Sequence, residues 1–217
     1  MSILGDSIST FAGYSNDAKN ANSTIGNNAV YYTGSNYLND VSQTWWKRSI
    51  DECGMKLLVN NSYSGDMVTK KAQERAINLH DDTIPSYETD PDIIAVYMGI
   101  NDFDNQVSLA YFKESYLGMV QKMMKRYHDA EIYLFTLVPN NQRKDEAALF
   151  QYNSVIKEIA EAYSLSIVDI YEDSNINQDN CSQYMGDSSL HPNIEGMQRI
   201  SDCFLDVLYE KAKLVLK

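Results

Sequence analysis

The sequence contains little of what would tie a protein to disulfides, metals or membranes. Its 217 residues include three cysteines, an odd number too small for a disulfide framework, and their spacing matches no zinc site. We therefore expect free, mostly buried thiols. No apolar stretch approaches the roughly 18 residues that a membrane-spanning helix needs. The first residues also lack the basic region and apolar stretch of a signal peptide.

Basic residues are also few. Lysine and arginine total 18 against 30 aspartates and glutamates, which gives a formal net charge of −12. Such a balance repels phosphates and so disfavours nucleic acids and anionic membranes as partners. The sequence has no glycine-rich phosphate loop and no metalloprotease helix, and the acidic stretch 169–179 lacks the ligand spacing of a calcium loop. We therefore predict no metal site, and the oligomeric state stays open.

Apolar runs and helical patterns alternate along the chain. After a short first run at residues 3–4, continuous apolar runs recur at 57–59, 93–98, 132–138 and 165–170. Continuous runs, rather than strict alternation, are typical of parallel strands that are covered on both faces. Apolar residues step by three and four in the segments between and after them, at 41–53, 109–127, 149–163 and 197–208.

This alternation predicts a three-layer α/β/α domain with a parallel sheet and right-handed crossovers. Because there is no internal repeat and no linker, we predict a single domain over residues 1–217. The first apolar run is shorter than an ordinary strand, so we expect residues upstream of this sequence in the native chain. The location in the cell stays open between the cytoplasm and a secreted domain.

Residues 12–40 form a long stretch that is rich in Asn, Ser, Gly and Tyr and has no periodicity. Connections of this length inside a compact domain are uncommon and are usually functional. The stretch follows the first strand and should lie over the carboxyl edge of the sheet, where open α/β sheets bind ligands. The alternative is a surface loop without a function.

A serine and a histidine at opposite ends of the chain suggest nucleophilic catalysis. Ser7 follows the first apolar run in Gly5-Asp6-Ser7, and His191 stands in the polar segment 186–193. A serine hydroxyl becomes a useful nucleophile when a base removes its proton, and histidine is the natural base near neutral pH. Taken alone, Ser7 would be a turn or helix-cap serine.

Two residues between them are candidate donors for an oxyanion. Gly65 can offer its backbone N–H where a substrate approaches closely, and Asn101 can offer its side-chain amide, in addition to the N–H of Ser7. Singly, Gly65 would be a turn glycine and Asn101 a helix cap. Because all four residues fall at the ends of predicted strands, the combination predicts a serine esterase.

The same residues carry a resemblance to a known family. Residues 3–8, Gly65, Gly99-Ile100-Asn101-Asp102 and His191-Pro192-Asn193 resemble, in order, the motifs of the SGNH hydrolases, also called GDSL esterases and lipases. The resemblance covers essentially the whole chain. It implies a flavodoxin-like sheet of five parallel strands in the order 2-1-3-4-5, no cofactor, and hydrolysis of esters through an acyl-serine. Carbohydrate O-acetyl esterases are the most similar type within the family.

One position departs from the family pattern. The family usually has an aspartate three residues before the histidine, and here that position is Ser188, whereas Asp187 lies four before. Either Asp187 reaches the far ring nitrogen of His191 across a one-residue insertion, or Ser188 or a backbone carbonyl orients the ring. We favour Asp187 as the third catalytic residue, because a carboxylate fixes the imidazole tautomer and stabilises its positive charge.

Aromatic side chains cluster in or beside the predicted active-site loops. Flat rings among Asn and Ser side chains suit a sugar, and no apolar lid helix is evident. The alternative for Trp45 or Trp46 is that it anchors its helix in the core. The aromatic residues are Tyr14, Tyr31, Tyr32, Tyr37, Tyr63, Trp45 and Trp46. From these aromatic residues and the Gly5-Asp6-Ser7 motif we predict six substrate-binding residues: Asp6, Tyr14, Tyr31, Tyr32, Trp45 and Tyr63.

The sequence thus predicts an esterase for short acyl groups, acetyl above all, carried on carbohydrate. A lipase or small-ester hydrolase is one alternative. The other is a catalytically silent domain that binds glycans, which the displaced Asp187 would explain. His80 and His128 follow helical patterns beside aspartates and are expected to be solvated rather than catalytic.

Overall fold

The computed structural model describes residues 1–15, 30–80 and 90–215. Four strands form its sheet, and each neighbouring pair is parallel: β1 (Ser2–Gly5), β2 (Ile93–Tyr97), β3 (Glu131–Phe135) and β4 (Ser166–Val168), in the order β1-β2-β3-β4. The strands are almost completely buried apart from the first residues of β2 and β3 and part of β4. Their continuous apolar sequences follow from this burial on both faces.

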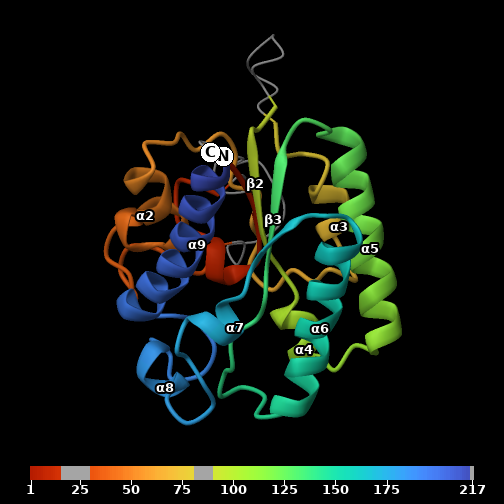
Figure 1. Ribbon diagram of the computed structural model, residues 1–217. Coiled ribbons are helices and arrows are strands. Elements are labelled where there is room, and N and C mark those ends of the chain that lie inside the picture. The colour runs from red at the N-terminus through yellow and green to blue at the C-terminus, as the bar shows by residue number, and fades with distance from the viewer. Residues whose placement is uncertain (16–29, 81–89, 216–217) are drawn as a thin grey trace, which may run out of the picture.

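Helices cover both faces of the sheet, which confirms the predicted α/β architecture (Figure 1). On one face α2 packs against α9, and on the other α5 packs against α6 and α3. The short helices α4, α7 and α8 lie toward the end of the sheet where the strands finish (Figure 1). The helical elements are η1 (Ser7–Ser9), η2 (Val41–Gln43), α2 (Trp45–Glu52), α3 (Ala72–Arg75), α4 (Ile100–Asp104), α5 (Leu109–Arg126), α6 (Glu146–Ala162), α7 (Ile170–Asp173), α8 (Cys181–Tyr184) and α9 (Ile194–Val215).

The expected five-stranded sheet in the order 2-1-3-4-5 was wrong for the described chain. The segment 57–59, expected as the second strand, lies beside β1 but is not a strand. Ile3 N–H donates to Val59 O and Asn61 N–H donates to Ile3 O, which makes one isolated bridge between Ile3 and Asn60. The Asn61 carbonyl, the next acceptor along this edge, instead accepts a hydrogen bond of 2.7 Å from the Arg75 guanidinium.

The predicted helices at 109–127, 149–163 and 197–208 are confirmed by α5, α6 and α9. The pattern over 41–53 corresponds to two elements instead of one, because the 3-10 turn η2 ends at Thr44 before α2 begins. The Thr44 side chain accepts a hydrogen bond from Lys47 N–H and so caps α2. Gly54, with a φ of +63°, ends that segment as expected.

Both tryptophans of α2 belong to the core. Trp45 and Trp46 are fully buried, and their indole N–H groups donate to the hydroxyl and the carbonyl of Ser9 at 3.1 and 3.0 Å. The expectation that at least one of them anchors the helix therefore holds for both. Because Ser9 lies two residues after Ser7, this anchoring also fixes the turn that carries Ser7.

A buried asparagine fixes the chain where β3 ends. Asn153 on α6 is 1% exposed. Its carbonyl oxygen accepts from Leu137 N–H at 2.7 Å, and its amide donates to Leu137 O at 2.9 Å. The loop that begins there carries Asn141, whose N–H donates to Ser189 O at 2.7 Å, next to His191. Asn153 thus holds the start of a loop that is itself hydrogen-bonded to the loop of His191.

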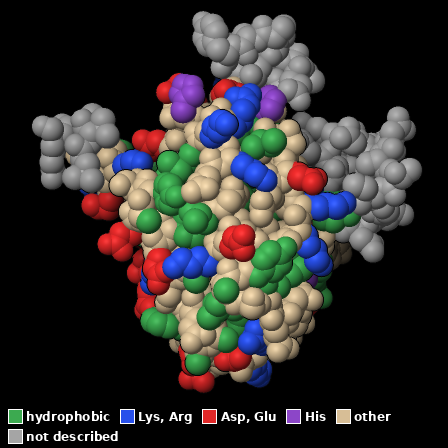
Figure 2. Space-filling view, turned by 90° about the vertical axis from the view of Figure 1, so that its right-hand side faces the viewer, with side chains coloured by type: hydrophobic (Ala, Val, Ile, Leu, Met, Phe, Trp, Pro, Cys, Tyr) green, Lys and Arg blue, Asp and Glu red, His purple; other side chains and the backbone are tan. Residues whose placement is uncertain are grey.

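The surface and the thiols agree with the composition. On the face drawn in Figure 2, acidic and basic side chains are interspersed and apolar ones occur in small groups. Cys53, Cys181 and Cys203 are free, and the last two are buried, as predicted. No helix among the described residues is long and apolar enough to cross a bilayer. The single-domain boundary at 1–217 stays a prediction.

Replacing Asn153 tests how much this contact contributes. We expect Asn153→Ala to lower the free energy of unfolding by about 2–4 kcal/mol, because the buried N–H and C=O of Leu137 lose their partners. Asn78→Ala, which removes an exposed hydrogen bond to Glu74 O, should change it by less than about 0.5 kcal/mol. Urea unfolding measures both variants. Equal values for the two would contradict the role of Asn153.

Candidate active site

Ser7 stands where β1 ends and the chain turns sharply. Asp6 caps the 3-10 turn η1, with its carboxyl accepting from Ile8 N–H at 3.0 Å. The Ser7 carbonyl accepts from Thr10 Oγ1 at 2.8 Å and from Thr10 N–H at 3.3 Å. Ser7 is 2% exposed. The turn therefore holds Ser7 firmly at the carboxyl edge of the sheet.

The chain brings His191 to this serine from 184 positions away. His191 Nε2 lies 2.9 Å from Ser7 Oγ, and His191 Nδ1 lies 2.5 Å from Asp187 Oδ2. With Nδ1–H donated to the carboxylate, Nε2 is left to accept a proton from the serine. Serine, histidine and aspartate thus form one continuous series of hydrogen bonds.

The extra residue between Asp187 and His191 is absorbed by Ser188. Ser188 has a φ of +57°, in the left-handed region, and is itself exposed. Its carbonyl accepts from Asn141 Nδ2 at 3.0 Å. Asp187 Oδ1 accepts from the N–H groups of Ser189, Leu190 and His191 at 2.9, 2.9 and 3.1 Å, while Oδ2 faces the imidazole. The group that meets the ring is therefore Asp187 and not Ser188.

These contacts set the charges of the pair. Burial would raise the pKa of Asp187, but the hydrogen bonds from His191 and the backbone amides outweigh it and lower the pKa to about 2. Burial lowers the pKa of His191 below its usual range, against the opposing influence of Asp187. At neutral pH the carboxylate is therefore charged and the imidazole neutral. This is the state that a general base requires.

Gly65 and Asn101 come together at the same edge. Asn101, in the first turn of α4, donates through Nδ2 to the carbonyl of Asp66 at 2.9 Å, directly after Gly65. Tyr63 N–H donates to Gly5 O at 3.1 Å and so ties this loop to the end of β1. Gly65 has a φ of +75° and is exposed, and a Cβ there would meet nothing within 4 Å. Backbone conformation rather than space favours glycine.

Asp102 supports this edge, although only its place in the motif marked it in the sequence. The side chain is fully buried. Oδ2 accepts from Val68 N–H at 2.8 Å, and Oδ1 accepts from Thr69 N–H at 3.1 Å and Thr69 Oγ1 at 2.7 Å. A buried carboxylate needs such donors, so Asp102 determines the course of the chain just after Gly65.

The structure corrects three of the predicted substrate-binding residues. Asp6, Tyr32 and Trp45 are at most 1% exposed, so no substrate can touch their side chains. Burial raises the pKa of Asp6 to about 8, which leaves its carboxyl largely neutral at pH 7. The Tyr32 hydroxyl donates to Pro192 O at 2.7 Å, and the Trp45 indole donates to Ser9. All three are therefore structural: Asp6 and Tyr32 hold the turns around Ser7 and His191, and Trp45 packs on core aromatic rings such as Phe135.

The other three predicted residues differ in their surroundings. Tyr14 is exposed and packs against Trp46, and Tyr63 is half-buried beneath the guanidinium of Arg75. Tyr31 stacks on the His191 ring, a contact that the sequence did not reveal. Of the stretch 12–40 predicted to cover the site, residues 16–29 lie outside the described residues. The described part that includes Tyr31 does reach the site.

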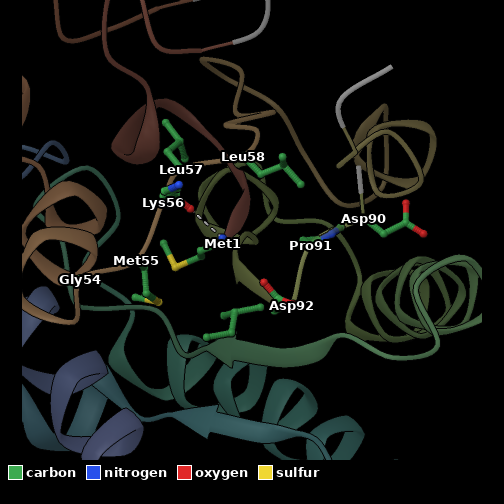
Figure 3. Close-up of a pocket in the computed structure, with 10 residues that line it drawn as sticks. Met1, Gly54, Met55, Lys56, Leu57, Leu58, Asp90, Pro91 and Asp92 are labelled. Atoms are coloured by element: carbon green, nitrogen blue, oxygen red, sulfur yellow. Dashed lines mark hydrogen bonds between the residues drawn. The ribbon is translucent and has the colours of Figure 1, made fainter. Parts of the chain in front are cut away.

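Other candidate sites lie away from Ser7. His80 Nδ1 lies 2.8 Å from the Tyr127 hydroxyl, and His128 pairs with Asp129 on the surface. Within the described ranges, no group of three or more His, Cys, Asp or Glu side chains is arranged to hold a metal ion. The hollow drawn in Figure 3 includes Met1 and residues 54–58 and 90–93, at the amino-terminal end of β1. Ser7 follows the opposite end of that strand.

Comparison with known proteins gives a consistent result. The family model described as GDSL-like lipase/acylhydrolase matches residues 1–208. No curated protein matches the chain.

Several solved structures share the fold. A Bacteroides ovatus ATCC 8483 protein, provisionally described as a GDSL-like lipase, has 23% identity and a TM-score of 0.70, with 96% of this chain and 98% of that chain covered. The lipase/acylhydrolase from Enterococcus faecalis has 19% identity and a TM-score of 0.65, covering 97% and 95%. A carbohydrate esterase family 3 protein from Talaromyces cellulolyticus has 16% identity and a TM-score of 0.66, covering 97% and 96%. At these identities the likeness is one of fold.

A serine-directed reagent tests the geometry directly. We expect phenylmethylsulfonyl fluoride to form one adduct per chain, at Ser7, because the neutral His191 can accept its proton. Since the pKa of His191 is lowered, the rate of labelling should reach half of its maximum at a pH below about 6.5, the ordinary pKa of histidine. Mass spectrometry of timed samples measures site and rate.

His191→Ala should remove this labelling, and Ser42→Ala, at an exposed serine, should leave it unchanged. An adduct on another serine, or a half-maximal labelling rate above pH 6.5, would contradict the assignment.

Proposed function

Because the chain belongs to the GDSL-like lipase/acylhydrolase family, it is a carboxylic ester hydrolase, and we propose that it removes short acyl groups, acetyl above all, from carbohydrate. The observation that carries the chemistry is the series of hydrogen bonds through Ser7, His191 and Asp187. Ser7 can act as the nucleophile, His191 as the base and Asp187 as the carboxylate that orients the base, and these roles need only the three side chains themselves.

We assign the steps as follows. His191 Nε2 takes the proton of Ser7 Oγ while Oγ attacks the ester carbonyl carbon. The imidazolium, stabilised by Asp187, then gives this proton to the leaving sugar oxygen, and the acyl group remains on Ser7. Water attacks the acyl-serine in the second half, with His191 again taking a proton and returning it to Ser7 Oγ. Acid and alcohol are released, and the enzyme is restored.

The negative oxygen that forms in each half is stabilised, in this proposal, by the N–H groups of Ser7 and Gly65 and by the amide of Asn101. Asn101 uses one amide hydrogen for the carbonyl of Asp66, which fixes its orientation and leaves the second hydrogen for the substrate. Donors that are held in place beforehand cost no reorganisation when the charge develops. The buried Asp102 beneath this loop supports that rigidity.

The surroundings favour a polar acyl carrier over a long fatty acid. Tyr31 and the exposed Tyr37 lie nearly parallel, at 14° with ring centroids 6.5 Å apart, on the His191 side of the site. Flat rings of this kind can stack on a sugar. Among the described residues, the strongly exposed aliphatic side chains are Ile77 and Ile194, too few for an extended strip on which a long acyl chain could lie.

A lipase or small-ester hydrolase remains the second candidate, favoured by the breadth of the matching family. The catalytically silent glycan-binding domain has lost its basis. It depended on a displaced Asp187, and this carboxylate does reach His191 at 2.5 Å.

Acyl length separates the two candidates. We expect p-nitrophenyl acetate to be hydrolysed with a higher kcat/KM than the butyrate and octanoate, and Ser7→Ala to lose turnover while keeping its fold. Acetylated xylan or acetylated cello-oligosaccharide should release acetate with the wild type and not with the variant. A preference for octanoate would replace the proposal by a lipase.

Single-residue variants test the assigned roles. Asn101→Ala should lower kcat by about 10²–10³-fold, the usual loss for one oxyanion donor. Asp187→Asn should lower kcat by up to about 10⁴-fold, because an amide favours the wrong imidazole tautomer. Steady-state kinetics on p-nitrophenyl acetate measures both, with Ser42→Ala as the control. Full kcat in either variant would remove that residue from the mechanism.

A further inference from the structure

Three tyrosines from the segment 31–37 hold the loop that carries Asp187 and His191. We call Tyr31, Tyr32 and Tyr37 the tyrosine clamp. Their contacts with the loop are at residue 186, at the Asp187–His191 pair itself, and at residue 192. The clamp therefore contacts the loop before Asp187, at the Asp187–His191 pair and after His191.

Tyr31 makes the central contact. Its ring lies face to face with the His191 imidazole, with ring centroids 3.4 Å apart and planes inclined by 10°. Its hydroxyl lies 3.2 Å from Asp187 Oδ2, the same oxygen that accepts from His191 Nδ1. Burial and the neighbouring Asp187 raise the pKa of Tyr31, so its hydroxyl stays protonated and donates. One side chain thus touches both members of the pair.

Tyr32 and Tyr37 hold Tyr31 and the loop in place. The buried Tyr32 ring meets Tyr31 edge-on at 4.9 Å and donates its hydroxyl to Pro192 O. Tyr37 lies directly against Gly186, where a Cβ would stand 2.2 Å from the Tyr37 ring. The residue before Asp187 must therefore lack a side chain for the clamp to close. This requirement is a steric reason for a glycine at position 186.

The backbone of Tyr31 is fastened to the nucleophile. Tyr31 N–H donates to Thr10 Oγ1 at 2.9 Å, and Thr10 Oγ1 donates to Ser7 O at 2.8 Å. The contacts therefore close a ring that runs from Ser7 through Thr10 and Tyr31 to His191 and back to Ser7. A shift of Tyr31 would change the distance between base and nucleophile.

We propose that Tyr31 is a positioning residue, whose ring fixes the plane of the His191 imidazole and whose hydroxyl fixes Asp187 Oδ2 as its acceptor. The proposal rests on the proposed function, in which His191 is the base. A flat ring packed at 3.4 Å prevents the imidazole from turning away from Ser7 and covers one of its faces from water. The same face can stabilise the imidazolium that forms during attack.

The pH dependence of kcat/KM reports the pKa of His191. A purely structural role of Tyr31 would leave this pH dependence unchanged. Among the described residues, the titratable groups facing the imidazole are Asp187 from its own loop, Tyr31 and Tyr32 from the clamp, and the hydroxyl of Ser7. If the hydroxyl of Tyr31 is removed, Asp187 loses a competing donor and attracts the imidazolium more strongly. The pKa of His191 should therefore rise.

The experiment compares Tyr31→Phe, Tyr31→Ala and the control Tyr209→Phe, at an exposed tyrosine of α9. For p-nitrophenyl acetate, Tyr31→Ala should lose about 10–100-fold in kcat, the scale of a misplaced catalytic group, with a smaller change in KM. Tyr31→Phe keeps the ring and should lose only several-fold, with the acid limb of kcat/KM moved to higher pH. Tyr209→Phe should match the wild type in every respect.

Labelling of Ser7 by phenylmethylsulfonyl fluoride, measured on the same variants, separates this proposal from the proposed function. If the wild type hydrolyses none of the esters, the proposed function fails. The positioning role would still be supported if Ser7 is labelled more slowly in Tyr31→Ala and if the pH dependence of labelling is shifted in Tyr31→Phe. An effect confined to KM would make Tyr31 a substrate contact instead. Unchanged kcat, labelling rate and pH limits in the folded Tyr31→Phe and Tyr31→Ala would overturn the proposal.

Discussion

A charged carboxylate that is largely removed from water must be surrounded by donors, and around Asp187 this requirement organises the half of the site that contains His191. Its two oxygens accept from three consecutive backbone N–H groups, from the ring of His191 and from the hydroxyl of Tyr31. The three amides determine the fold of the loop, the ring bond determines the tautomer of His191, and the tyrosine couples the loop to the start of the chain. If the carboxylate were lost, each of these groups would lose its common partner.

The sheet supplies the other half of the site. Parallel strands end at one edge, so Ser7 after β1 and Asn101 after β2 lie at the same edge of the sheet although 94 positions separate them in the sequence. Gly65 joins them because its loop is bonded to the end of β1 and accepts the amide of Asn101. His191 comes from outside the sheet, between α8 and α9, and the loop after β3 braces it through Asn141 and Ser189.

The site is rigid because its supports are buried in the layers of the domain. Trp45 and Trp46 fasten Ser9 from the α2 layer, and Asn153 fastens the end of β3 from the α6 layer. Asp102 binds the loop after Gly65 to α4. Each of these polar contacts lies inside the protein, where an unmade hydrogen bond is costly, so the correct arrangement is strongly preferred over alternatives. Rigidity of this kind is what a preorganised site for a developing oxyanion needs.

The sequence by itself determined the features that depend on local pattern. Apolar runs predicted the four strands β1 to β4, and helical spacing predicted α5, α6 and α9. Strands that are buried on both faces are apolar throughout, whereas helices that bury one stripe are apolar at every third or fourth residue, so the two patterns can be told apart. The motifs around Ser7, Asn101 and His191 indicated the chemistry, because few residue types can serve as nucleophile, oxyanion donor and base. Ser7 and Asn101 do follow strands, but the expectation that His191 also lies at a strand end was wrong, since it stands between α8 and α9.

Only the tertiary structure decided what depends on contacts between distant segments. Nothing in the local pattern of 57–59 shows that its pairing with β1 is limited to an isolated bridge at Asn60, so this edge segment was expected to be the second strand of the sheet. The same holds for Tyr32 and Trp45, which are as aromatic as Tyr31 but buried. That Asp187 reaches His191 across an extra residue depends on the left-handed turn at Ser188 and on the clamp. Asn141 contacts this turn from 47 positions away, and Tyr31 contacts Asp187 from 156 positions away.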